Sequence, residues 1–492
     1  MSLLSLKSGT DIRGTAVGEN ASLTDEAVRK ITYGFVQYLK EKTGLEPNFM
    51  TVCVGNDSRI STARIKRAVC GVLQACGVRV YDCGLSSTPA MFMTTVVMNV
   101  TAAVQITASH HPSDKNGLKF FTKEGGFEGD EIRTVLEYAE AAGDVPCLAF
   151  PNLRHSNFME DYAGLLREMI RKAVNAEDYT HPLKGFHIVV DAGNGVGGFY
   201  ERVLASLGAD TAGSQFLEPD GAFPNHIPNP ENETAMSFIC DAVKRSGADL
   251  GIIFDTDVDR AACVGADGEE INRNALIALA SVIALEGNPG GMIVTDSVTS
   301  DGLKDFIEKE LGGVHYRYKR GYKNVINKAV ELNKAGVNCP LAIETSGHAA
   351  LRENYFLDDG AYLMTKIVIL AAKLRAEGKT LSSLLSGLRR PAEALEKRYT
   401  IQLADFRPYG EKVIADLEEY CKGFGYLAPA PDNREGFRVS FDKEHGDGWL
   451  LLRLSVHDPV LPLNIESNVP GGAAKIEAFF DAFIGRYDAL CG

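Results

Sequence analysis

Short apolar runs alternate with longer amphipathic stretches through most of this chain, and no other feature limits its fold as much. Each run has the length of a buried strand, and each stretch is long enough for a helix that covers it. Strands and helices that alternate in this way build layered α/β domains. The runs lie at residues 51–55, 78–82, 101–107, 187–191, 250–254, 292–295 and 341–344. The sequence therefore predicts an α/β fold with three similar units.

The length of the chain and a change of pattern near its end predict the number of domains. At the usual size of about 100–200 residues per domain, 492 residues correspond to three or four domains. Beyond about residue 395 a helix-like stretch at 409–423 precedes strand-like runs at 436–441 and 448–455, as in a smaller α+β domain. We predict α/β domains at 1–150, 151–265 and 266–393, and a C-terminal α+β domain at 394–492.

The charge and the cysteines limit the partners and the compartment. The formal net charge is −14, whereas nucleic acid and anionic membranes bind through basic surface, so neither is expected as a partner. Ten cysteines are scattered along the chain without a Cys-x-x-Cys pair. Neither a signal peptide nor a run of roughly 18 apolar residues occurs in the sequence. We expect a cytoplasmic protein with reduced thiols.

Three carboxylates alternate directly after the apolar run 250–254, at Asp255, Asp257 and Asp259. Like charges this close repel by roughly 4 kcal/mol per pair at an effective dielectric near 20, so a cation or full solvation must relieve them. A calcium loop of the EF-hand type would need glycine and glutamate where Arg260 and Ala266 stand. Oxygen ligands without histidine or cysteine favour Mg²⁺. A solvated acidic turn is the alternative.

Ser109 stands in a short polar loop, Thr-Ala-Ser-His-His-Pro at 107–112, where a serine can face a ligand. The adjacent histidines do not indicate a serine hydrolase, because no Gly-x-Ser-x-Gly elbow surrounds Ser109. A turn stabilised by serine and proline is the structural alternative. A glycine-rich segment at 193–198 has the spacing Gly-x-Gly-x-Gly-Gly instead of that of a dinucleotide site, so we expect a structural turn there.

The serine loop and the aspartate loop together resemble motifs of the α-D-phosphohexomutase family, of the phosphoglucomutase/phosphomannomutase type. Further motifs that are similar to those of the family follow in the same order along the chain. They are Ser-Gly-Thr-Asp-Ile-Arg-Gly at 8–14, Gly-Asn-Asp-Ser-Arg at 55–59, Asn-Gly-Leu-Lys at 116–119, Gly-Tyr-Lys at 321–323, Glu-Thr-Ser-Gly-His at 344–348 and Asp-Asp-Gly at 358–360. The resemblance implies three similar mixed α/β domains and a smaller α+β C-terminal domain around a central cleft.

The resemblance also implies a reaction, the interconversion of hexose 1-phosphate and hexose 6-phosphate, with glucose, mannose or both as the sugar. Ser109 would carry the phosphoryl group, and a hexose 1,6-bisphosphate would be both intermediate and activator. Mg²⁺ would be held by Asp255, Asp257, Asp259 and the phosphate oxygen at Ser109. Proton transfer at the sugar hydroxyl would fall to Lys119, His110 or Arg13.

The remaining implied site residues would bind a small-molecule sugar phosphate, in a monomer or homodimer. They are Arg260, Lys323, Glu344, Ser346 and His348 for the sugar and its charge, and Arg453, Ser455 and His457 for the non-reacting phosphate. The phosphate loop departs from the family pattern, since Val456, His457 and Asp458 replace glycine, threonine and glutamate. A second departure is His111, where asparagine is usual.

Three other functions stay open at this point. A phosphoglucosamine mutase shares the Ser-Gly-His ending at 346–348, and a sugar-phosphate-binding relative without turnover would fit the altered phosphate loop. A phosphotransferase of the haloacid dehalogenase type also begins with Asp-x-Asp after an apolar strand. That pattern requires threonine or valine at the fifth position, where Asp259 stands.

Overall fold

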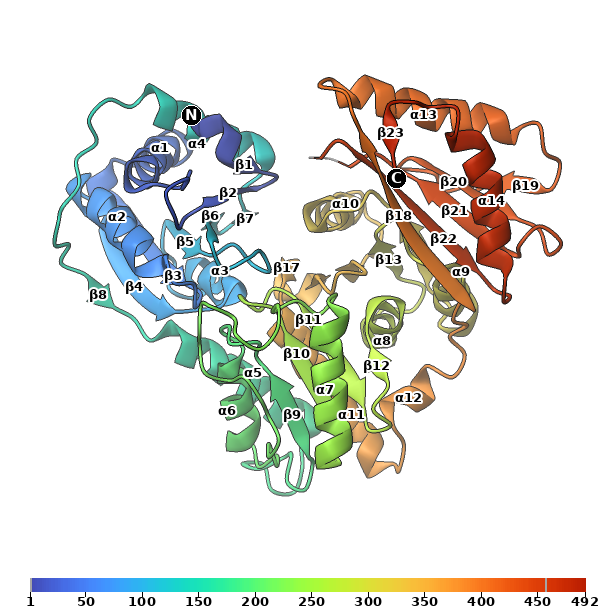
Figure 1. The fold of residues 1–492 in the computed structure, drawn as a ribbon. Helices are drawn as coiled ribbons and strands as arrows, with labels where there is room; N and C mark the ends of the chain where they lie inside the picture. Colours follow the sequence, from blue (N-terminus) through green and yellow to red (C-terminus); the bar gives the residue numbers. More distant parts are fainter. Residues whose placement is uncertain (1, 456–457) are drawn as a thin grey trace. The chain divides into compact units, whose positions relative to one another are not determined.

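The computed structural model describes residues 2–455 and 458–492 and divides the chain into two compact units. The first unit takes in the chain up to Leu276 together with Ser346–Leu384. The second unit consists of Ile277–Thr345 and Leu385–Gly492. Figure 1 labels helices and strands of both units.

The N-terminal part of the first unit is a mixed sheet with helices packed on it. β3 pairs in parallel with β4 and β5, and β4 with β8, while the β1-β2-β6-β5 side is antiparallel. In order across the sheet the strands are β1 (Lys7–Ser8), β2 (Asp11–Thr15), β6 (Lys115–Thr122), β5 (Ala102–Ile106), β3 (Thr51–Asn56), β4 (Arg79–Leu85) and β8 (Arg154–His155), with β7 (Gly125–Gly126) beside β6. The helices are η1 (Leu3–Leu6), α1 (Asp25–Thr43), η2 (Pro47–Phe49), α2 (Thr62–Ala75), α3 (Thr88–Val97) and α4 (Gly129–Ala141).

Local sequence explains why α1 begins and ends where it does. The Thr24 side chain accepts a hydrogen bond from the amide of Ala27, and Gly44 ends the helix with a φ of 69°. The buried face of α1 then packs on the sheet through Phe35, whose ring lies 4.5 Å from that of Phe120 between ring centroids. Capping and burial therefore fix this helix on the sheet that carries the serine loop.

A second sheet of the first unit carries the aspartate loop. β9 and β10 are parallel, and β10, β11 and β12 are antiparallel neighbours. The strands are β12 (Glu270–Ile271), β11 (Ala261–Gly265), β10 (Leu250–Phe254) and β9 (Ile188–Asp191), in that order, with the helices α5 (Phe158–Val174), α6 (Gly198–Ser206) and α7 (Glu233–Ser246). The later segment of this unit adds the strand pair β16 (Ala349–Leu351) and β17 (Leu357–Asp358), η4 (Arg352–Asn354), α11 (Gly360–Ala376) and α12 (Leu381–Leu384).

The second unit holds a parallel sheet and an antiparallel one. The first is β13 (Met292–Thr295) between β14 (Val314–Arg317) and β15 (Leu341–Ile343), with α8 (Arg273–Glu286), α9 (Asp301–Asp305), η3 (Phe306–Glu310) and α10 (Tyr322–Lys334). The second is antiparallel throughout, in the order β19 (Leu427–Pro429), β20 (Phe437–Phe441), β21 (Gly448–Leu452), β22 (Val460–Ser467), β18 (Glu393–Ile401) and β23 (Leu490–Cys491). Two helices, α13 (Phe406–Cys421) and α14 (Gly472–Ile484), contribute to its buried core.

These elements confirm the predicted fold class, α/β domains followed by an antiparallel α+β domain. The predicted strand at 448–455 ends earlier, at Leu452, because the chain then enters the connection to β22. All ten cysteines are free in the structure, and six of them are buried. Among the described residues, no helix is long and apolar enough to cross a membrane. The boundaries of the four predicted domains stay predictions.

Candidate active site in the first unit

The aspartate loop follows β10 directly and is completely buried. Asp255, Asp257 and Asp259 each have an exposed fraction of 0 %, and one carboxylate oxygen of each lies within 4.8 Å of the others. The loop turns sharply at Val258, whose φ of 66° is in the left-handed region that β-branched residues avoid. The Val258 carbonyl accepts a hydrogen bond from the Gly360 amide (3.0 Å), which holds this turn against the start of α11.

The pKa values of the loop follow from burial and from neighbouring charges. Burial, together with the charges of Asp259 and Asp257, raises the pKa of Asp255 well above its ordinary value. Burial also acts to raise the pKa of Asp259, but Lys119 and Arg260 outweigh it and lower that pKa. The Lys119 amine lies 2.5 Å from Asp259 Oδ2 and 3.4 Å from Asp257 Oδ2. Negative charge is thus concentrated here and only partly balanced.

The aspartate loop fits a divalent cation. Asp257 Oδ1 and Asp259 Oδ1 are buried, and neither has a hydrogen-bond partner in the described part of the chain. A buried carboxylate oxygen without a donor is unfavourable unless a cation or water meets it. With Asp255, the loop offers an all-oxygen ligand set of the kind that Mg²⁺ prefers. The acidic cluster can therefore hold a metal.

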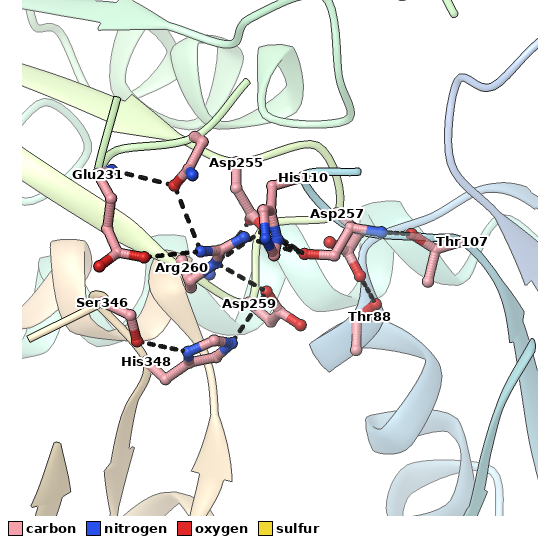
Figure 2. Close-up of polar contacts among 12 residues, drawn as sticks. Thr88, Thr107, His110, Glu231, Asp255, Asp257, Asp259, Arg260, Ser346 and His348 are labelled. Carbon is pink, nitrogen blue, oxygen red and sulfur yellow. Dashed lines mark hydrogen bonds and ion pairs between the residues drawn. The ribbon is translucent and has the colours of Figure 1, made fainter. Parts of the chain in front are cut away.

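Ser109 lies against this loop, and Figure 2 shows its neighbours His110, Asp255 and Arg260. Its hydroxyl donates to Asp255 Oδ2 (2.9 Å) and accepts from the Arg260 guanidinium (3.2 Å). The Nδ1 atom of His110 lies 3.3 Å from the same oxygen. Ser109 itself has a φ of 48°, and its amide donates to Thr107 Oγ1 (2.9 Å). The structure thus joins two predicted motifs that are about 146 residues apart in the sequence.

Basic side chains surround the serine and the aspartates. Burial, followed by the nearby charge of Arg260, lowers the pKa of His110 far below its ordinary value. Burial and Arg13 lower the pKa of His111 to about 4. Arg13 is itself ion-paired with Asp11 at 2.8 Å. Both imidazoles are therefore neutral near pH 7, whereas the guanidinium groups supply the positive charge.

His348 and Ser346 approach the aspartate loop from the segment before β16. The Nε2 atom of His348 lies 3.8 Å from Asp259 Oδ1, and its Nδ1 atom lies 2.9 Å from the Ser346 hydroxyl. Burial and the charge of Arg260 lower the pKa of His348. Asp259, His348 and Asp358 form a second group whose ligand atoms lie within 4.8 Å of one another. These predicted residues thus join the site of the first unit.

The other predicted site residues belong to the second unit. The carboxylate of Glu344 accepts a hydrogen bond from the Gly321 amide (2.6 Å), at the start of the helix α10 that carries Lys323. Arg453 follows β21 and is 8 % exposed, and burial together with the charge of Arg320 lowers its pKa. Ser455 pairs with Val460 through a backbone hydrogen bond of 2.9 Å. The predicted phosphate ligand His457, with Val456, lies outside the described residues.

Several residues of the site are absent from the sequence prediction. Thr88, at the start of α3, donates its hydroxyl to Asp257 Oδ2 and its amide to the Asp257 carbonyl (2.9 Å). Asn229 and Glu231 hold the Arg260 guanidinium, at 3.3 Å and 3.7 Å. The Ser-Thr-Pro at 87–89 is a recognisable helix start, but nothing in it indicates which loop the helix faces.

Three family models match the chain in succession. Alpha/beta/alpha domains I, II and III of the phosphoglucomutase/phosphomannomutase family match residues 6–143, 160–268 and 272–391. The chain is 30% identical over 462 residues to the phosphoglucomutase/phosphomannomutase of Thermococcus kodakarensis, with 93% of each chain covered. It is 29% identical over 476 residues to the phosphoglucomutase of Neisseria gonorrhoeae, covering 96% of this chain and 95% of that protein.

A solved structure of the same family is also similar to this chain. The crystal structure of a phosphoglucomutase/phosphomannomutase family protein from Burkholderia thailandensis has a TM-score of 0.80 and 26% identity, and the match covers 99% of this chain and 98% of that chain. The three matched α/β/α domains are those of a class of enzymes that transfer phosphoryl groups. The chain belongs to the phosphoglucomutase/phosphomannomutase family of α-D-phosphohexomutases.

This membership decides among the functions that the sequence left open. The chain is a phosphohexomutase, an intramolecular phosphotransferase. The haloacid dehalogenase alternative is therefore set aside. The preferred sugar and the roles of individual residues stay predictions.

Proposed function

We propose that this enzyme interconverts hexose 1-phosphate and hexose 6-phosphate of glucose, mannose or both, with Ser109 as the phosphoryl carrier. One observation carries the proposal: the Ser109 hydroxyl is buried and lies 2.9 Å from Asp255 Oδ2, beside a cluster of aspartates suited to a divalent cation. A serine so placed can bear a phosphoryl group next to the charges that transfer requires.

The reaction consists of two transfers in opposite directions. In the first, the Oγ–P bond of Ser109 breaks while a P–O bond forms at the free hydroxyl of the sugar phosphate, whose proton passes to a base. The resulting hexose 1,6-bisphosphate reorients, and its other phosphoryl group then returns to Ser109. Added bisphosphate would phosphorylate an empty Ser109 and so act as activator.

The charges around Ser109 fit this chemistry. The Arg260 guanidinium contacts the Ser109 oxygen at 3.2 Å and can follow negative charge on the phosphoryl oxygens. Mg²⁺ bound to Asp255, Asp257, Asp259 and an oxygen at Ser109 would neutralise charge that develops on the transferred group. Lys119 balances the aspartates through its contacts with Asp257 and Asp259.

For the proton, three groups remain candidates. His110 Nδ1 is 3.3 Å from the Ser109 oxygen, so this ring can exchange a proton with it or with a nearby hydroxyl. Lys119 is bound to the aspartates, and Arg13 is paired with Asp11. We assign the proton step to Lys119 or His110 and a supporting positive charge to Arg13.

The sugar and its non-reacting phosphate would be bound by the remaining predicted residues. A carboxylate such as Glu344 can accept hydrogen bonds from two adjacent hydroxyls in either orientation of the sugar. Ser346, His348 and Lys323 would also bind the sugar or its charge. The phosphate would be bound by Arg453, Ser455 and His457. The Ser-Gly-His at 346–348 keeps glucosamine phosphate as a second candidate substrate.

The free state of all ten cysteines supports a cytoplasmic location.

The test is turnover of glucose 1-phosphate in a coupled assay with a trace of glucose 1,6-bisphosphate. Ser109→Ala should abolish turnover and leave the fold intact, because only one hydroxyl is lost. Ser113→Ala, directly after the serine loop, is the matched control and should keep full activity. A Ser109→Ala enzyme with near-normal turnover would move the nucleophile elsewhere. Initial rates on glucose, mannose and glucosamine phosphates would identify the preferred sugar.

A further inference from the structure

We propose that Arg59 is a positioning residue of the mutase reaction, which holds the serine loop in the conformation that presents Ser109 to the aspartates. This inference rests on the proposed role of Ser109 as phosphoryl carrier. Arg59 does not contact the Ser109 hydroxyl, so it would act only through the backbone of the loop.

The guanidinium of Arg59 binds the serine loop at three points and the first residue of β6 at a fourth. Its Nη1 atom donates to the carbonyls of Pro112 (2.6 Å) and Lys115 (2.8 Å). Its Nη2 atom donates to the carbonyls of Ser109 and His111, both at 2.5 Å. The side chain is completely buried, with an exposed fraction of 0 %. A planar guanidinium presents these donors in a fixed fork, which the single ammonium of a lysine does not reproduce.

A second connection runs from Arg59 to the amide of Ser109. The Nε atom of Arg59 is ion-paired with Asp57 Oδ2 at 3.2 Å, and the same oxygen accepts the Thr107 hydroxyl (2.7 Å). That hydroxyl in turn accepts the Ser109 amide (2.9 Å). The amide and the carbonyl of Ser109 are thus both bound by a network that starts at Arg59.

The backbone of Ser109 requires such a restraint. Its φ of 48° lies in the left-handed region, which a residue other than glycine occupies at a cost and keeps only where its surroundings enforce it. A change of φ at Ser109 would swing its hydroxyl away from Asp255 and Arg260. The clamp on both sides of the residue keeps that hydroxyl in place.

On the side away from the serine loop, Arg59 is covered by the segment 221–223, which precedes α7 in the first unit. The ring of Phe223 has its centroid 5.3 Å from the guanidinium carbon of Arg59. Gly221 approaches the backbone at Ser58 so closely that an added Cβ atom would lie 2.4 Å from the Ser58 carbonyl oxygen. Arg59 is therefore enclosed between the serine loop and this segment.

The glycine-rich turn at 193–198 connects the segment around 221–223 to the aspartate loop. The Asn194 carbonyl accepts the Asp220 amide (2.9 Å), and the Val196 amide donates to the Thr256 carbonyl (2.9 Å). An added Cβ atom at Gly195 would lie 2.5 Å from the same Thr256 oxygen. Gly195 is therefore required by close packing against the aspartate loop. Through these hydrogen bonds the turn connects the segment that covers Arg59 with the loop whose aspartates face Ser109.

The test compares Arg59→Ala and Arg59→Lys with Arg64→Ala in steady-state kinetics and thermal unfolding. Arg64 is the matched control, because it also binds two backbone carbonyls, of Ala16 and Leu23, and a carboxylate, that of Asp25. We expect kcat to fall about 100-fold in both Arg59 variants, with KM changed by no more than about threefold, because a small displacement of a reacting group has that effect. Arg64→Ala should lower Tm but keep kcat.

Two further readouts separate positioning from stability. Guanidinium ion at millimolar concentration should restore part of kcat in Arg59→Ala, and Arg59→Ala should be phosphorylated more slowly at Ser109 by glucose 1,6-bisphosphate in intact-mass measurements. If Arg59→Ala does not fold, Arg59→Lys decides, since it keeps the charge beside Asp57. An Arg59→Lys enzyme with normal kcat, or kcat losses that follow Tm equally in the Arg59 and Arg64 variants, would overturn the inference. Activity in Ser109→Ala would instead refute the proposed function.

Discussion

Two residues of the candidate site, Ser109 and Val258, have a left-handed backbone, and they stand in the serine loop and the aspartate loop. Left-handed conformations at residues other than glycine cost about 1–3 kcal/mol each and persist only where the surrounding structure enforces them. Thr107 and Arg59 enforce the first, and the Gly360 amide enforces the second. The hydrogen bonds of the site therefore hold these two residues in strained backbone conformations.

Thr88 offers a test of the aspartate loop at the residue scale. Its hydroxyl donates to Asp257 and so orients one proposed metal ligand. Thr88→Val should raise the Mg²⁺ concentration for half-maximal activity by about 10–100-fold, since partners of metal ligands commonly contribute that much to affinity. The measurement is a Mg²⁺ titration of activity after treatment with a chelator. Thr95→Val, which removes a hydroxyl bonded to the Phe92 carbonyl of the same helix, should leave the titration unchanged. Equal titrations for both variants would contradict the prediction.

At the scale of elements, the strands position the residues of the candidate site. β5 leads into the serine loop, β6 carries Lys119, and β10 leads into the aspartate loop. In the second unit, β20, β21 and β22 bring Arg438, Trp449 and Glu466 together. The Arg438 guanidinium lies 3.5 Å from the Trp449 ring centroid, and the Trp449 indole donates to Glu466 at 3.0 Å. Sheet register therefore creates buried polar clusters as well as the site.

The half-buried carboxyl of Glu466 predicts a pH dependence of stability. Burial raises its pKa to about 7, although Arg438 and the Trp449 hydrogen bond act to lower it. The folded state thus binds this proton more tightly than the unfolded state, whose pKa is about 4.5. Its contribution to stability is complete below about pH 4.5 and is lost as the pH rises through 7.

Glu466→Gln should remove that loss. The variant should match the wild type near pH 5 and exceed its free energy of unfolding by about 1–3 kcal/mol at pH 8. Urea unfolding at both values of pH is the measurement. A difference from the wild type that is the same at pH 5 and pH 8 would show that Glu466 does not titrate in this range.

At the scale of the whole molecule, the two compact units do not follow the family domains. The third matched domain, 272–391, contributes Ile277–Thr345 to the second unit and Ser346–Leu384 to the first. The boundary passes through the Glu-Thr-Ser-Gly-His motif at 344–348. The Thr345 hydroxyl donates a hydrogen bond to Asp296 of the second unit, and the Ser346 hydroxyl is hydrogen-bonded to His348 of the first. Residues predicted to bind one sugar thus belong to two separately packed bodies.

This division predicts unfolding in more than one transition, as is usual for chains with several domains. The single tryptophan, Trp449, belongs to the second unit, so its fluorescence reports on that unit, whereas far-UV circular dichroism reports on both. Arg64→Ala removes hydrogen bonds worth about 1–2 kcal/mol from the first unit and should shift only the dichroism curve. Coincident curves, shifted together by the variant, would refute independent units.

Three features could be predicted because a short contiguous stretch of sequence specifies each of them. They are the alternation of strand and helix, the serine loop and the aspartate loop. Hydrophobic period and residue type act locally, so the fold class and the candidates Ser109, Asp255, Asp257 and Asp259 could be named from the sequence. Only the tertiary structure decided that Thr88 meets Asp257, 169 positions away, and that Arg59 clamps the serine loop. The physical reason is that such hydrogen bonds depend on how strands are ordered and loops are packed, which no short stretch of sequence encodes.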